Sequence, residues 1–219
     1  MSEINRNRSN SRKKLLLFIQ FSMLLAIEAI VCFTPLGSLP IGPLVATLSH
    51  IPVVITAVSL GVGSGAAMGF AFGLFSFIVW TFMPPAAPMA FVFTPFYQAG
   101  PMQGNFWSLV ICFVPRILLG VIAGLTTKFF ETRFPKRAPL GYVLAGVFAS
   151  IAHTILVLGG IYLFFGAEYA EVNGMAFEAL LAALATVVAT NGVLEAVLAG
   201  VLGVAVAVPV KKIMAKQAF

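Results

Sequence analysis

Apolar runs of membrane-spanning length recur along most of the chain, and they limit its possible folds more than any motif does. Hydrophobic residues make up 60% of the 219 residues and charged residues only 9%, which is far from the composition of soluble domains. A helix needs about 20 apolar residues to cross a bilayer, so this length permits about six spans with short connections. We therefore predict an all-α, polytopic membrane protein with six transmembrane helices.

The boundaries of the spans follow from the apolar runs and the turn residues between them. The spans are predicted at Leu15–Phe33, Leu44–Leu60, Ser64–Phe82, Asn105–Lys128, Leu140–Phe165 and Ala176–Val208. Residues 15–219 then form a single membrane domain behind a basic tail, residues 1–14, which is too polar to order itself.

Two Pro-rich connections are expected on the outer face. Thr34–Pro43 predicts a constrained loop that can act as a lid. Met83–Gly104 is too apolar and aromatic for a flexible linker, so we expect it to pack over the outer mouth of the bundle or to re-enter it.

The basic residues indicate which way the chain crosses the membrane. Of 13 Lys and Arg residues, five precede the first span, four lie in Lys128–Arg137 and three follow the sixth span. With an even number of spans these twelve share one side, and the positive-inside rule places that side, and both termini, in the cytoplasm. Because the basic residues flank apolar runs, the net charge of +6 does not indicate nucleic-acid binding.

Arg116, the remaining basic residue, lies in the middle of an apolar span. An arginine there costs at least about 2.5–3.5 kcal/mol on insertion scales, so it should face an anionic partner. That partner is either a buried carboxylate, Glu28 or Glu195, or an acidic solute bound between the helices. By helix depth, Glu28, His50 and Arg116 share the outer half of the bundle, with Asn191 and Glu195 below them. These five residues are the candidate substrate site.

Small residues at every fourth position mark surfaces for close helix contact. Gly65, Gly69 and Gly73 form such a packing seam on the third span, and Ser22 and Ala26 form a shorter one on the first. We expect one or both to be the docking surface for a partner subunit.

Motifs for other chemistries are missing from the sequence. It contains no C-x-x-C, H-E-x-x-H or phosphate-binding loop, which predicts no metal site and no bound cofactor. An intramembrane enzyme using Glu28, His50, His153 or Glu195 is an alternative, although these residues show no catalytic spacing. A structural scaffold is another, but it leaves the costly Arg116 unexplained.

Three segments resemble one transporter family, and the similarity extends over nearly the whole chain. They are FTPLGSLPIGPLVATLSHIPVVI, GVGSGAAMGFAFGLFSFI and FWSLVICFVPRILLG. They are similar to the substrate-specific S components of energy-coupling factor (ECF) vitamin transporters, and closest to the pantothenate-type branch. This resemblance implies a non-catalytic cell-membrane protein that binds a vitamin beneath outer loops. It also implies association with a transmembrane coupling subunit and two ATPase subunits. The family's A-x-x-x-A docking motif is Ser22-x-x-x-Ala26 here.

The charge of Arg116 narrows the choice of vitamin. A single arginine suits a small monocarboxylate with polar groups, such as pantothenate, and would repel a cation such as thiamine. Riboflavin, cobalamin, pyridoxal-type vitamins and folate remain alternatives.

Overall fold

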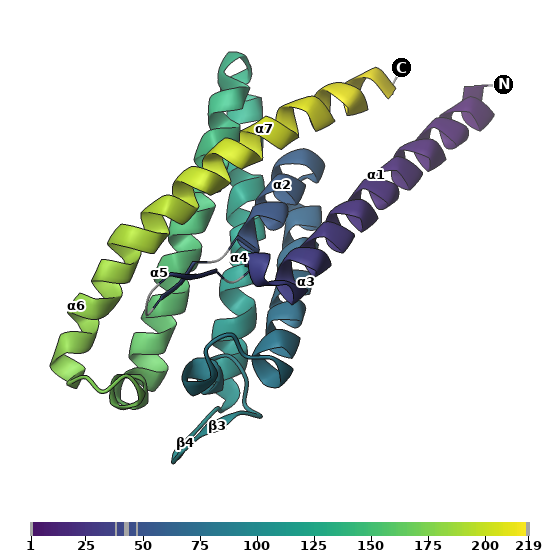
Figure 1. Ribbon diagram of the computed structural model, residues 1–219. Helices are drawn as coiled ribbons and strands as arrows, with labels where there is room; N and C mark the ends of the chain where they lie inside the picture. Colours follow the sequence, from purple (N-terminus) through teal and green to yellow (C-terminus); the bar gives the residue numbers. More distant parts are fainter. Residues whose placement is uncertain (1, 38, 42–43, 47, 218–219) are drawn as a thin grey trace.

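The structure is a computed structural model that describes residues 2–37, 39–41, 44–46 and 48–217, and most of these residues are helical (Figure 1). The α-helices are α1 (Ser2–Phe33), α2 (His50–Leu60), α3 (Val62–Phe82), α4 (Phe106–Arg133), α5 (Ala138–Val172), α6 (Phe177–Val187) and α7 (Val193–Gln217). Short helical turns are η1 (Pro35–Gly37), η2 (Ala87–Val92), η3 (Pro135–Arg137) and the π-helical η4 (Val188–Gly192). Two antiparallel hairpins pair β1 (Leu39–Ile41) with β2 (Leu44–Ala46) and β3 (Gln98–Ala99) with β4 (Met102–Gln103).

Five helical segments of the described chain are long and apolar enough to cross a membrane. They are Ser11–Phe33, Val62–Phe82, Phe106–Arg133, Pro135–Val172 and Phe177–Ile213. The predicted all-α membrane fold is thus confirmed in outline, and five of the six predicted spans correspond to these segments.

The prediction of a full helix over Leu44–Leu60 is wrong. Leu44–Ala46 is strand β2, and α2 begins only at His50. Pro52 explains the late start, because proline is tolerated in the first turn of a helix but removes a hydrogen bond from its interior. With 11 residues and a rise of 1.5 Å per residue, α2 is only about 16 Å long, roughly half a hydrocarbon core.

The basic N-terminal segment also differs from its prediction. Its backbone is helical from Ser2 onward, continuous with the apolar part of α1. Helical hydrogen bonds are local and add residue by residue once a nucleus exists, so the apolar segment can extend its helix into polar sequence without tertiary contacts.

The glycine seam of α3 packs against α4 of the same chain. A Cβ atom on Gly69 would lie 2.2 Å from the carbonyl oxygen of Arg116, and one on Gly65 would lie 2.7 Å from the carbonyl oxygen of Gly120. Gly73 is similarly close to Phe113. These contacts make the seam an internal interface. The docking hypothesis therefore now rests on Ser22, which is half-buried on α1, and on Ala26, which is exposed there.

The Met83–Gly104 segment folds back onto the bundle. Phe91, Val92 and Met102 are buried in a cluster with Ile111 of α4 and Phe165 of α5. Figure 1 shows this segment at one end of the molecule, with both termini and the α4–α5 turn at the other.

Candidate ligand-binding site

The structure contains a cavity of about 160 Å³ between α3, α4, α5 and the α6–η4–α7 segment. Part of its wall comes from the Met83–Gly104 segment, through Ala86, Met89 and Phe93. Its polar and charged lining residues include Ser49, Ser76, Arg116, His153, Thr154, Tyr169, Asn191 and Glu195. Its larger apolar lining residues include Phe72, Trp80, Phe93, Val157, Leu158 and Ile161.

Arg116 is the charged group on the α4 wall, and its side chain is only 5% exposed. Nη1 donates hydrogen bonds to the carbonyl oxygens of Ile111, at 3.0 Å, and Cys112, at 2.9 Å. Nε donates to Ser76 Oγ at 3.3 Å. These acceptors are all formally neutral, so the hydrogen bonds hold the guanidinium group without neutralising it.

Aromatic rings enclose the guanidinium group. Its central carbon lies 5.1 Å from the centre of the Phe72 ring and 5.5 Å from that of Phe93. Trp80 stacks on Phe93 with a centroid distance of 4.6 Å. Such cation–π contacts are each worth roughly 0.5–2 kcal/mol and exclude water, which strengthens the attraction of Arg116 for an anion.

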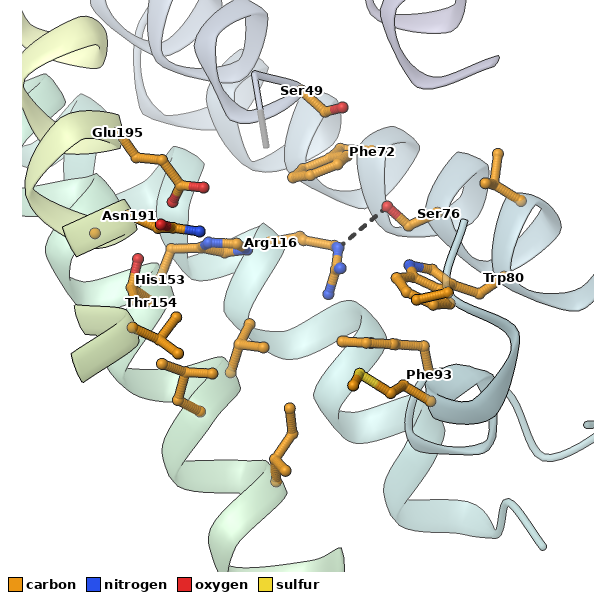
Figure 2. A pocket seen from close by; sticks show the side chains of 18 of the residues that line it. Ser49, Phe72, Ser76, Trp80, Phe93, Arg116, His153, Thr154, Asn191 and Glu195 are labelled. Atoms are coloured by element: carbon orange, nitrogen blue, oxygen red, sulfur yellow. Dashed lines mark hydrogen bonds between the residues drawn. The ribbon is translucent and has the colours of Figure 1, made fainter. Parts of the chain in front are cut away.

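The opposite wall of the cavity presents an amide, on Asn191, and an imidazole, on His153 (Figure 2). Asn191 is 9% exposed and His153 is 7% exposed. In the described part of the chain, Asn191 Nδ2 and His153 Nε2 have no hydrogen-bond partner. Buried polar atoms normally have partners, so these two atoms are available for hydrogen bonds to a bound molecule.

The π-helical turn η4 contains Asn191. A π turn inserts one extra residue into the helical spacing and often occurs at functional sites. Despite this turn, Asn191 and Glu195 both line the cavity, as their four-residue separation predicts.

The predicted site residues separate into two layers. Arg116, Asn191 and Glu195 line the cavity, whereas Glu28 and His50 are buried outside its lining. His50 Nε2 lies 3.3 Å from the carbonyl oxygen of Glu195, within hydrogen-bonding distance, and Glu28 Oε1 accepts a hydrogen bond at 3.2 Å from Cys32, a lining residue.

Sequence reasoning did not assign Ser76, Trp80 or Phe93 to the site. Ser76 follows Phe72 by one helical turn, and Trp80 follows Ser76 by another, so the spacing of these three residues predicts that they share one face of α3. Phe93 offered none, because it comes from an irregular segment whose path depends on tertiary packing.

Comparisons with known proteins agree with this geometry. A family model described as "ECF transporter, substrate-specific component" matches residues 17–207. The chain is also 35% identical over 165 residues to the pantothenic acid transporter PanT of Lactococcus lactis subsp. cremoris (strain MG1363), covering 75% of this chain and 76% of that protein. The matched family is one of transporter components and not of enzymes. The chain is therefore a multi-pass cell-membrane protein that belongs to the family of ECF transporter substrate-specific components.

Proposed function

We propose that this chain binds pantothenate in the cavity and is the substrate-specific subunit of an ECF-type uptake transporter. The observation that carries the proposal is Arg116, a buried cation whose hydrogen-bond acceptors among the described residues are all neutral. Pantothenate is a monocarboxylate with an amide and two hydroxyl groups, which matches a cavity with one cationic wall and one wall of hydrogen-bonding groups.

The ligand lies with its carboxylate at Arg116 and its hydroxyl and amide groups toward α5 and α7. Asn191 Nδ2 donates to a ligand oxygen, and His153 Nε2 supplies a second hydrogen bond. The carboxylate of Glu195 accepts from a ligand hydroxyl, while His50 and Glu28 support the wall from behind. The branched methyl groups of the vitamin fit against Val157, Leu158 and Ile161, which line the same side.

In the membrane, the chain makes six passes with both termini in the cytoplasm. Here α2 completes a short second pass behind the β1–β2 hairpin, and α6, η4 and α7 act as one sixth pass. The shared position of the termini and the basic α4–α5 turn in Figure 1 supports this orientation. The cavity then opens toward the outside.

Energy for uptake comes from partner subunits. A transmembrane coupling subunit docks on α1 at Ser22 and Ala26, and two ATPase subunits hydrolyse ATP. The chain itself does not catalyse ATP hydrolysis or any other reaction. Its basic residues 1–14 lie on the cytoplasmic side of the membrane.

Mass spectrometry of small molecules that co-purify with the detergent-solubilised chain tests the proposed ligand. We expect pantothenate, and we expect isotopically labelled pantothenate, but not thiamine, to displace it. Recovery of riboflavin, cobalamin, a pyridoxal-type vitamin or folate instead would contradict pantothenate as the substrate and identify that vitamin as the ligand. A lipid intermediate would favour the intramembrane enzyme.

A further inference from the structure

Pro115 lies inside α4, directly before Arg116. In an α-helix the N–H group of residue 115 would donate to the carbonyl oxygen of Ile111, but proline has no N–H group. That carbonyl oxygen accepts a hydrogen bond from Arg116 Nη1 at 3.0 Å instead. The arginine side chain thus replaces the backbone donor that proline removes.

This replacement determines which edge of the guanidinium group remains available. Nη1 has two hydrogens, and its two acceptors are the carbonyl oxygens of Ile111 and Cys112. Nε donates to Ser76. An arginine carries five N–H donors, so the two on Nη2 remain, and this nitrogen has no hydrogen-bond partner in the part of the chain that the structure describes. Figure 2 shows the guanidinium group in the cavity between the Ser76 and Phe93 sides.

We propose that Pro115 is a positioning residue for anion binding: by freeing the Ile111 carbonyl oxygen, it anchors one edge of Arg116 and directs Nη2 to the ligand carboxylate. This inference rests on the proposed function, because it concerns how Arg116 recognises an acid. The oxygen of Ser76 accepts from Nε, so its hydroxyl hydrogen can donate to the same carboxylate.

The ratio of the affinities for pantothenate and for its alcohol analogue, pantothenol, tests this role. Pro115→Ala restores the backbone N–H group, which then competes with Nη1 for the Ile111 carbonyl oxygen. We expect the acid-to-alcohol ratio to fall by roughly threefold to tenfold, the size of one weakened hydrogen bond to a charged group. Binding of the alcohol should change little.

Two controls separate this effect from a general effect of proline. Pro209 also lies inside a helix, at an exposed position on α7 that does not line the cavity, so Pro209→Ala should leave the ratio unchanged. Replacement of Pro115 by lactic acid, through an ester bond in the main chain, gives the methyl group of alanine without the N–H group. This variant should keep the wild-type ratio.

The outcomes separate failure of the inference from failure of the proposed function. If the wild-type chain prefers the acid but Pro115→Ala keeps the full ratio, or weakens both ligands equally, Pro115 does not position Arg116. Equal acid-to-alcohol affinity ratios for the alanine and lactic acid variants would also overturn the inference. This comparison remains decisive if both variants are less stable than the wild-type chain, because the two differ only at the backbone N–H group. If the wild-type chain shows no preference for the acid, the proposed function itself fails.

Discussion

Arg116 is held by carbonyl and hydroxyl oxygens and by aromatic rings. The alternative of a structural ion pair would place a carboxylate on the guanidinium group, and these contacts do not include one. A buried charge is costly unless another charge or a set of dipoles compensates it. Under the proposed function, a bound anion adds to the compensation that these dipoles give the guanidinium charge.

His153 allows the two walls of the cavity to be tested separately. Replacing it with leucine removes Nε2 and introduces an apolar side chain of similar size. Because its hydrogen bond would go to a group that pantothenate and pantothenol share, we expect His153→Leu to weaken both ligands by a similar factor, roughly threefold to tenfold. Isothermal titration calorimetry measures both affinities, and a loss confined to the acid would contradict this assignment.

The sequence predicted the residues that line the cavity better than it predicted which candidate residues lie outside the lining. Arg116 was predictable because a cation in an apolar span is costly wherever it points. Asn191 and Glu195 were predictable from helical spacing. The separation of His50 and Glu28 from the cavity was not, since it depends on the short α2 helix and on how α1 packs.

At the scale of helices, the close contact between α3 and α4 positions the residues around Arg116. Gly69 lies directly against the backbone carbonyl group of Arg116, so α3 and α4 approach each other closely at the position of this arginine. The sequence predicted this seam from its glycine spacing, but which helix would fill it depended on the tertiary fold.

A methyl group at Gly69 should disrupt that approach. Its Cβ would lie 2.2 Å from a backbone oxygen, which forces the helices apart and costs on the order of 1–3 kcal/mol or more. We expect Gly69→Ala to lower both the unfolding temperature and the pantothenate affinity. Gly63→Ala is the matched control. Gly63 lies in the same helix, and no atom lies within 4 Å of a Cβ added there. Equal unfolding temperatures for the two variants would contradict the packing account.

The Met83–Gly104 segment should respond to ligand. Because Ala86, Met89 and Phe93 line the cavity, bound pantothenate should slow hydrogen exchange of the backbone around η2. The α4–α5 turn, at the other end of the molecule in Figure 1, serves as an internal control and should exchange at the same rate with and without ligand. Unchanged exchange around η2 would exclude a gating role for this segment. The Thr34–Pro43 loop, also predicted as a lid, falls partly outside the described residues.

At the scale of the whole molecule, the proposed ligand site and the proposed docking surface lie on different parts of the chain. The cavity lies within the bundle, whereas Ser22 and Ala26 lie on α1, and neither residue lines the cavity. The helical membrane fold was predictable from hydropathy. The helix α2 was predicted too long, because composition alone cannot distinguish a half-length helix followed by another helix from one full span.

This separation predicts a variant that assembles poorly but still binds vitamin. Ala26→Trp places a bulky ring on an exposed position of α1, so it should abolish pull-down of the coupling subunit and leave pantothenate affinity within about twofold. Ala182→Trp makes the same change at an exposed position of α6 and should leave both properties intact. Normal assembly of the Ala26 variant together with lost affinity would refute the division of surfaces.

The most direct measurement compares pantothenate with pantothenol on the purified wild-type chain and on Arg116→Ala. Truncating a buried charged partner typically costs 2–5 kcal/mol. We therefore expect the wild-type chain to bind the acid roughly thirtyfold or more tightly than the alcohol. The Arg116→Ala chain should lose this preference and bind both ligands with similar, weak affinity. If the wild-type chain binds the alcohol as tightly as the acid, Arg116 does not hold the ligand carboxylate, and the site assignment is wrong.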